Sequence, residues 1–366
     1  MFKESQPIIV GKELPKQEVK SNLETINGVI ILDLDGTLTV PGSKYAVDKR
    51  TLGDVSEFVL NGGICALNTG ATKERAERTF LHPIFCLLDE QCGFDKASEI
   101  FSKKMWLLPE NGSSILKSKG VTVMENELWF LWDEHNPLHL PNKENVRNLI
   151  ETILVPKIPG SFVIGDKPGE VGRRNYILSW KGLKNVPDLI EMIRNEVIPQ
   201  TDKIINWNEI EMKAARTTID FINAKSGKEP STRKFLSMID CSGPIVGFGD
   251  LGDEFARDHR VLTFNVNAQK PNSFRMAGVP SMEVSRWRSV CVNDCFISSD
   301  DKVFFNEKEI QVLRDKEGKI FLSNFDQDGK ATDKENILVI DPLTKGAGEA
   351  TAEMLERLMK IGYFDK

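Results

Sequence analysis

The stretch VIILDLDGTLTV, residues 29–40, decides the fold. Four apolar residues run together and lead directly to Asp33 and Asp35, two carboxylates that repel each other. Burying a carboxylate without a partner costs several kcal/mol, so a cation has to neutralise this pair. The stretch therefore predicts a buried strand that ends in two acidic side chains facing a cation at the edge of a sheet.

Two further runs share this design. ICAL at 64–67 leads to an Asn and then to Thr69, and PIVGF at 244–248 leads to a Gly and then to Asp250. Continuous apolar runs are typical of strands covered on both faces, and helix-like segments lie between them. This alternation predicts a Rossmann-like, doubly wound parallel α/β sheet. Ligands bind beyond the carboxyl ends of such strands, so we expect Asp33, Thr69 and Asp250 to converge.

The composition indicates a cytoplasmic globular protein. The chain has 366 residues, 40% apolar and 28% charged, and a net charge of −6, which argues against a nucleic-acid or membrane partner. A length of this order suggests about two domains. No window approaches the roughly 18 apolar residues of a membrane helix, and the N-terminus lacks an apolar signal core. The six scattered cysteines are expected to be reduced thiols.

The pattern along the chain predicts an α/β core interrupted by an α+β unit. Strand-like pieces with aromatic and polar alternation, such as ELWFLWDE, characterise the interrupting unit. The last stretch, GEATAEMLERLMKIG, has apolar residues at helical spacing. The expected division is an N-terminal extension at 1–27, the core at 28–117 and 223–366 with a hairpin insertion at 288–336, and the α+β unit at 118–222.

Two aspartates two residues apart at a strand end suit phosphoryl transfer. Phosphate monoesters hydrolyse so slowly that catalysis can need up to about 10²¹-fold acceleration. One carboxylate can attack phosphorus while the other protonates the leaving oxygen, because strand side chains repeat every two residues. Gly36 permits a tight turn after them. Mg²⁺ prefers oxygen ligands and would be the cation.

Three segments resemble motifs of the haloacid dehalogenase superfamily of phosphatases. DLDGTLT is similar to its first motif, LNTGAT to its second and GFGDLGDE to its fourth. The resemblance implies that Thr69 and Gly70 bind phosphate. It also implies metal binding by Asp33, Asp35 and the acidic residues of the fourth motif, Asp250, Asp253 and Glu254. The family commonly has Arg after the Thr-Gly pair, where this chain has Ala71.

The third family motif is a lysine at the start of a helix shortly before the fourth motif. Lys228 matches the family spacing best, and Lys225 and Lys234 remain alternatives. PENGSSI, residues 109–115, resembles the strand that precedes a C2-type cap in the sugar-phosphate phosphatases of the superfamily, which include Cof-like, sucrose-phosphate and mannosyl-phosphoglycerate phosphatases. The α+β unit would then be such a cap.

Two other segments invite functional interpretations. In the cap, Arg173 and Arg174 could reach a second anionic group of the substrate, although a solvated turn also explains them. NFDQDGKATDKE, residues 324–335, follows the spacing of an EF-hand Ca²⁺ loop. Its flanks look like strands rather than helices, so an acidic hairpin turn is the better interpretation.

The resulting expectation is a Mg²⁺-dependent phosphatase acting on a small phosphorylated metabolite, most simply a sugar phosphate. Asp33 attacks phosphorus, Asp35 protonates the leaving alcohol and later activates water, and Thr69 and Lys228 neutralise the phosphoryl oxygens. Two alternatives remain open. A phosphohexomutase would return the phosphoryl group to a hydroxyl, and a non-catalytic or Ca²⁺-regulated binding protein would hydrolyse nothing. The oligomeric state stays open as well.

Overall fold

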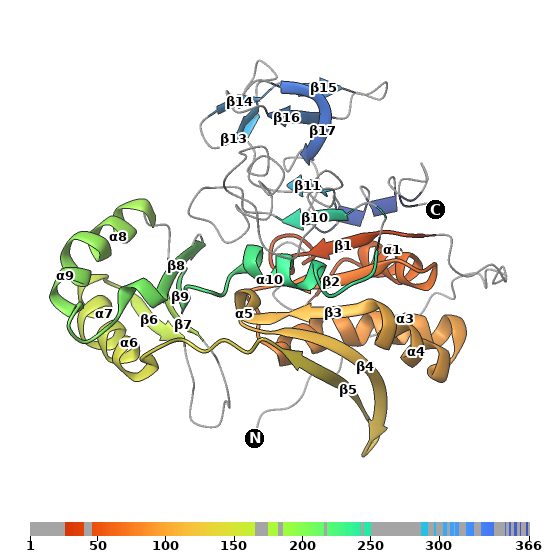
Figure 1. The fold of residues 1–366 in the computed structure, drawn as a ribbon, viewed down its shortest axis with the longest axis horizontal. Helices are drawn as coiled ribbons and strands as arrows, with labels where there is room; N and C mark the ends of the chain where they lie inside the picture. Colours follow the sequence, from red (N-terminus) through yellow and green to blue (C-terminus); the bar gives the residue numbers. More distant parts are fainter. Residues whose placement is uncertain are drawn as a thin grey trace.

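The computed structural model describes a ten-stranded core sheet, a four-stranded sheet in an inserted unit and a small three-stranded sheet (Figure 1). The described residues are 26–39, 46–164, 175–181, 186–215, 218–241, 243 and 245–249, the strands between Trp287 and Val339, and single positions between 348 and 364. Within this part of the chain, no helix combines the length and the apolar character needed to cross a membrane.

The core is a ten-stranded sheet with parallel strands at its centre. Its order is β15-β16-β17-β11-β10-β1-β2-β3-β4-β5. The central parallel strands are β1 (Val29–Leu32), β2 (Ile64–Asn68), β3 (Met105–Leu108), β10 (Ile245–Gly249) and β11 (Trp287–Cys291). The parallel α/β sheet predicted from the apolar runs is therefore confirmed.

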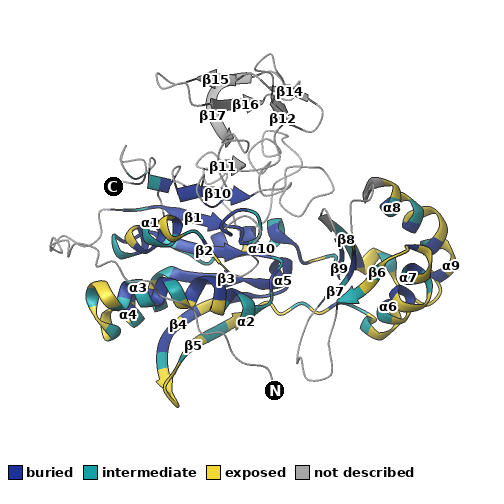
Figure 2. Cartoon of the chain, turned by 180° about the vertical axis from the view of Figure 1, so that it is seen from behind, coloured by how far each residue is buried: buried dark blue, intermediate teal, exposed yellow. Residues whose placement is uncertain are grey.

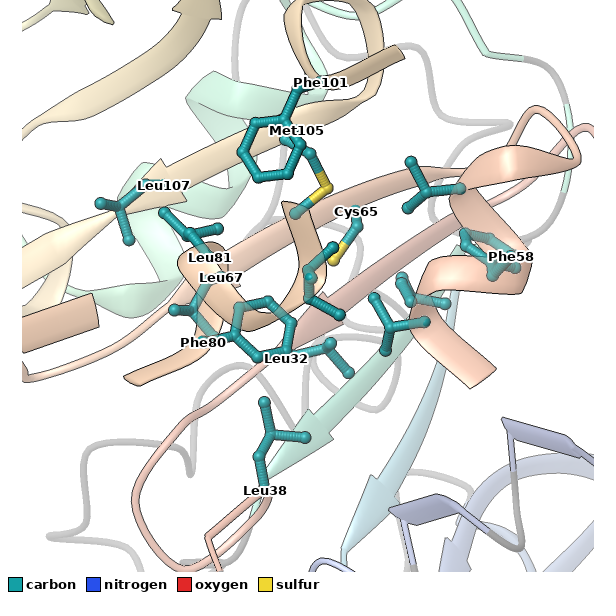
Figure 3. Packing of buried hydrophobic residues seen from close by; sticks show 14 of the residues in the cluster. Leu32, Leu38, Phe58, Cys65, Leu67, Phe80, Leu81, Phe101, Met105 and Leu107 are labelled. Carbon is teal, nitrogen blue, oxygen red and sulfur yellow. The ribbon is translucent and has the colours of Figure 1, made fainter. Parts of the chain in front are cut away.

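Both faces of this sheet are buried. Ile30 and Leu32 of β1 join one apolar cluster, whereas Val29 and Ile31 join a second cluster on the opposite face. Figure 3 shows the first cluster, in which Phe58, Phe80 and Phe101 from the helices pack over the strands. The helices of the core are α1 (Lys49–Leu60), α2 (Lys73–Ala76), the π-helix η1 (Glu77–Leu81), α3 (His82–Cys92), α4 (Phe94–Lys104), α5 (Pro109–Gly112) and α10 (Lys228–Leu236).

A second, antiparallel sheet forms the inserted unit. It has the order β6-β7-β9-β8 and its own apolar cluster around Ile150, Ile193 and Phe221. Asn223 at its exit donates from Nδ2 to the carbonyl of His139 at its entrance, over 2.9 Å. Its elements are α6 (Lys143–Leu149), η2 (Ile150–Leu154), α7 (Val155–Lys157), β6 (Ser161–Ile164), β7 (Tyr176–Trp180), α8 (Val186–Met192), η3 (Ile193–Val197), α9 (Ile198–Thr201), the 3₁₀ turn η4 (Trp207–Glu209), β8 (Ile210–Ala215) and β9 (Thr218–Asn223).

The hairpin of β4 (Ile115–Met124) and β5 (Glu127–His135) belongs to the core sheet rather than to the inserted unit. From the sequence we expected ELWFLWDE, which lies within β5, to belong to the inserted unit at 118–222. Alternate residues of β5, Leu128, Phe130 and Trp132, pack against the core cluster, which explains the pairing. Figure 2 shows that the tip of this hairpin is exposed. We propose that the inserted unit begins after His135.

The segment expected to be a hairpin insertion contributes strands to two sheets. β11 extends the core in parallel with β10, and β17 (Ala331–Val339) pairs in parallel with β11. β16 (Ile320–Phe325) and β15 (Val312–Arg314) follow antiparallel, while β12 (Phe296–Ile297), β13 (Val303–Phe305) and β14 (Lys308–Ile310) form a small sheet. The EF-hand-like stretch therefore includes the end of β16 and the start of β17, which pair with each other, as its strand-like flanks predicted.

The last helical stretch packs against α1. Its described positions between 348 and 359 are helical, and Thr351, Ala352 and Leu355 are buried, which confirms the predicted amphipathic pattern. Arg50 donates to Glu356 over 2.7 Å. Beside this pair, burial and the charge of Glu356 raise the pKa of Asp54 to about 6.

We predict that Asp54→Asn stabilises the protein above neutral pH. A raised pKa favours the folded state while Asp54 is protonated, below about 3.8, and this contribution is lost as the pH rises through about 6. Asn cannot ionise, so the free energy of unfolding in urea should increase by about 1 kcal/mol at about pH 8, a value discounted for solvent screening.

The same substitution should change the free energy of unfolding little at about pH 4, where wild-type Asp54 is largely protonated. Glu57→Gln removes an exposed carboxylate from the same helix and serves as the control. Equal effects of Asp54→Asn at both pH values would contradict the prediction.

Candidate active site

The register of the central strands brings their polar ends together. Leu32 of β1 pairs with Leu67 of β2 on one side and with Phe248 of β10 on the other. Asp33, the next residue, donates its backbone N–H to the carbonyl of Phe248 over 3.1 Å and is only 6% exposed. Asp33, Asn68 and Gly249 therefore end three neighbouring strands at one edge, as expected for ligand binding in a parallel sheet.

Lys228 reaches this edge from the first residue of α10. Its Nζ donates to Oδ1 of Asp33 over 2.5 Å, and the residue is only 5% exposed. Lys225 and Lys234, the alternatives left open by the sequence, are both exposed. Among the three lysines, the structure thus brings Lys228 to the first-motif aspartate across 195 positions of sequence.

The loop after β2 places a hydroxyl beside the aspartate strand. Thr69 is fully buried, and its Oγ1 accepts the backbone N–H of Ala71 over 3.0 Å. Its own N–H donates to the carbonyl of Leu108 at the end of β3. Because one lone pair of Oγ1 is engaged by an N–H, the hydroxyl proton is directed elsewhere and can donate to an anion. Gly70 follows in a bend.

The chain turns sharply after Asp35. Gly36 has φ 80°, a left-handed conformation that favours glycine, and its N–H donates to Oγ1 of Thr39 over 3.1 Å. The Asp35 carboxylate lies against the guanidinium of Arg75, with two hydrogen bonds between them. No role for Arg75 was predicted from the sequence.

The PENG segment connects the loop of Thr69 and Gly70 to the inserted unit. It forms the short turn α5, rather than the strand implied by the family resemblance, because Glu110 and Asn111 both adopt left-handed backbone conformations. The N–H of Asn111 donates to the carbonyl of Thr69 over 2.8 Å. Its Nδ2 donates to Oδ2 of Asp220 in β9 over 2.6 Å, and Asp220 is fully buried.

A second contact strengthens this connection. Asn175, immediately before β7, donates from Nδ2 to the carbonyl of Glu110 over 2.8 Å. Gly112 packs so closely on α10 that an added Cβ would lie 2.1 Å from Oγ of Ser231. The turn therefore touches the loop of Thr69, the inserted sheet and the helix that carries Lys228.

Asn68 is a site-building residue that the sequence analysis missed. The residue is 2% exposed, and its Nδ2 lies 2.8 Å from the carbonyl of Lys228 and 2.9 Å from Oγ1 of Thr232. The amide of β2 therefore holds the first turn of α10 in place beneath the lysine. An Asn at the end of an otherwise apolar run was the available signal, because a buried amide needs partners.

Several predicted site residues lie outside the described part of the chain. These are the acidic residues of the fourth motif and the two cap arginines, namely Asp250, Asp253, Glu254, Arg173 and Arg174. Among the described residues, no three His, Cys, Asp or Glu side chains form a group that could hold a metal ion. Metal binding by the fourth motif and substrate binding by the arginines therefore remain predictions.

The chain is similar to solved structures, but its sequence as a whole matches no known family. No family profile matches the sequence, and no curated protein matches it. Solved structures similar to this chain include the C-terminal domain of C. albicans trehalose-6-phosphate phosphatase, with 13% identity, a TM-score of 0.47, and coverage of 92% of this chain and 93% of that one. Crystal form 3 of Aspergillus fumigatus trehalose-6-phosphate phosphatase shares 14% identity with this chain at a TM-score of 0.42. The match covers 91% of this chain and 93% of that one.

The sucrose-phosphatase from Synechocystis, solved with sucrose and phosphate, shares 16% identity over 62% of this chain and 76% of its own, with a TM-score of 0.38. The strand order and the positions of the motifs carry the assignment of the fold. The chain combines an α/β sheet, with Asp33, Thr69 and Lys228 at one edge, and an inserted α+β unit, which is the arrangement that the motif resemblance predicted.

We predict that Asn68→Leu lowers activity through Lys228. Removing the amide leaves buried acceptors on α10 without their donor, which should lower the free energy of unfolding by about 1–3 kcal/mol. The first turn of α10, and with it the Lys228 side chain, should then be held less firmly in position. A displacement of about 1 Å can cost about 10²-fold in turnover, so a loss of at least about tenfold in kcat is expected. Phosphate release from an aryl phosphate measures it.

A double-substitution cycle separates this effect from general destabilisation. In a Lys228→Met background, Asn68→Leu should lower kcat no further, because the group it positions is gone. Thr51→Val removes a buried hydroxyl that donates to Gly348 on another side of the core and controls for lost stability. Additive losses from Asn68→Leu and Lys228→Met would contradict the prediction.

Proposed function

We propose that the protein is a Mg²⁺-dependent phosphomonoesterase that hydrolyses a small phosphorylated metabolite, most simply a sugar phosphate. The observation that carries the proposal is the buried pair of Asp33 and Lys228 at the carboxyl edge of a parallel sheet, next to the Thr69 hydroxyl. A buried carboxylate held by a lysine and flanked by a hydroxyl donor suits in-line attack on a phosphate ester.

The first half of the reaction uses five groups of the chain. An oxygen of Asp33 attacks phosphorus, so that an Asp33 O–P bond forms while the bond to the ester oxygen breaks. Asp35 gives its proton to that departing oxygen. Thr69 donates its hydroxyl to a phosphoryl oxygen, Gly70 offers its backbone N–H, and Lys228 neutralises developing negative charge.

The second half returns the enzyme to its starting state. Water attacks phosphorus and gives a proton to Asp35, the bond between phosphorus and Asp33 breaks, and inorganic phosphate leaves. Asp35 thus acts first as an acid and then as a base, which leaves it protonated for the next cycle. The inserted unit would cover the site and exclude bulk water during both halves.

The residues at this edge fit a magnesium ion. Asp33 would supply a carboxylate and a backbone carbonyl near Asp35 a second oxygen, and β10 ends at Gly249, one residue before Asp250. Such hard oxygen donors are those that Mg²⁺ prefers. We propose that Asp250, with Asp253 or Glu254, completes the site. When bound, the ion would neutralise charge on the phosphoryl group.

The substrate would be a small phosphate ester with a second polar or anionic part. The contacts of Asn111 and Asn175 hold the inserted unit next to the loop of Thr69, which supports a small substrate rather than a macromolecular one. Arg173 and Arg174 are proposed to bind the part of the substrate distant from the reacting phosphate.

We predict that the purified protein releases phosphate from an aryl phosphate and from sugar monophosphates in the presence of Mg²⁺. Chelation of the ion should abolish release, and Mg²⁺ should restore it. Asp33→Asn removes the attacking carboxylate and should lower release to the level of a blank without enzyme. Asp240→Asn, an exposed site of the same charge change, should leave release unchanged.

The assay also distinguishes the alternatives. Isomerised sugar phosphate without free phosphate would indicate a mutase. No turnover of any ester by the wild-type protein with Mg²⁺, or full turnover by Asp33→Asn, would exclude the proposed phosphatase.

A further inference from the structure

Both oxygens of the Asp35 carboxylate accept hydrogen bonds from one side chain, that of Arg75. Nη1 of Arg75 donates to Oδ2 over 2.8 Å, and Nη2 donates to Oδ1. Paired parallel hydrogen bonds of this kind fix the plane and the direction of a carboxylate, which a single contact cannot do. Asp35 is therefore held in one orientation.

The contact with Arg75 determines the orientation of Asp35 because the rest of the Asp35 side chain is open to solvent. Its side chain is 44% exposed, compared with 8% for that of Asp33, so burial alone does not restrict its rotation. The Arg75 side chain is 23% exposed and hence more enclosed than the carboxylate it contacts. The guanidinium, rather than packing around Asp35, sets the direction of the carboxylate.

Arg75 itself is carried by a well-anchored element. Helix α2 begins directly after the phosphate-binding loop, and Oγ1 of its N-cap residue Thr72 accepts the backbone N–H of Arg75 over 3.4 Å. The next residues along the helix, including Ala76 and Phe80, are fully buried in the core. The guanidinium is thus tied to the same rigid segment that carries Thr69.

We propose that Arg75 is a positioning residue: when Asp35 carries its proton on one oxygen, the guanidinium holds the other oxygen as acceptor and so directs the protonated oxygen at the departing ester oxygen. The proposal rests on the proposed function, in which Asp35 is the acid of the first half-reaction. Ala71 is buried and uncharged, so the loop itself provides no cation for Asp35, and Arg75 supplies it from one helical turn further along the chain.

The chemistry of the leaving group gives the proposal a specific signature. As the Asp33 O–P bond forms and the ester P–O bond breaks, a sugar alkoxide needs the Asp35 proton, whereas dinitrophenolate departs without one. If Asp35 is misdirected, phosphoryl transfer from esters of alcohols should therefore become slower, whereas transfer from the activated aryl ester should keep its rate. A general loss of structure would slow both.

The experiment compares Arg75→Met with the wild-type protein on a sugar monophosphate and on dinitrophenyl phosphate. The quantity measured is kcat/KM, which reports on steps up to transfer to Asp33 and excludes the later hydrolysis. We expect kcat/KM to fall by about 10²-fold for the sugar ester and to stay nearly unchanged for the aryl ester. Lys73→Met, which removes a positive charge from the same helix, should change neither.

Two further variants sharpen the test. Arg75→Lys keeps the charge but loses the planar fork, so its kcat/KM for the sugar ester should lie between those of the wild type and Arg75→Met. In an Asp35→Asn background, Arg75→Met should have no further effect on the sugar ester, because the group that it aims is already inactive.

Equal losses on both esters would overturn the proposal, since they would indicate that Arg75 binds the phosphoryl group or supports the fold. An unchanged kcat/KM for the sugar ester would overturn it as well. Failure of the proposed function looks different, because Asp33→Asn would then retain activity toward both esters.

Discussion

The buried ion pair of Asp33 and Lys228 is the interaction on which the arrangement of the site depends. Each partner is almost completely withdrawn from water, and either charge left alone there would be strongly destabilising. The pair therefore couples the end of β1 to the start of α10, and Asn68 and Gly112 support α10 from the adjoining strand and turn. The inserted unit lies between β1 and α10 in the sequence, so this ion pair joins the part of the core that precedes the unit to the part that follows it.

Local sequence predicted the centre of the fold well. Apolar runs covered on both faces identify β1, β2 and β10, and the polar residues that follow β1 and β2 lie at one edge because parallel strands share a direction. Spacing from Phe235 favoured Lys228 over its neighbours, and the contact with Asp33 agrees. The catalytic roles of these residues remain predictions.

Contacts between distant segments could not be predicted in the same way. The strand β5 alternates aromatic and polar residues, a pattern that fits either sheet, and only packing of Phe130 and Trp132 against the helices places it in the core. In the sequence, Arg75 cannot be distinguished from other charged residues at the start of a helix. Its partner is Asp35, which precedes the turn at Gly36 and lies 40 positions away in the chain. Asn68 gave a signal, but its partners lie 160 and more positions away.

The contact between Asn223 and His139 makes the entrance and the exit of the inserted unit neighbours. A segment whose two ends meet can be exchanged for a longer, shorter or unrelated one while the ladder of core strands stays continuous. The core sheet and the inserted unit can then change independently during evolution. The same geometry makes this junction a natural place to graft the inserted unit of another protein that shares the core sheet.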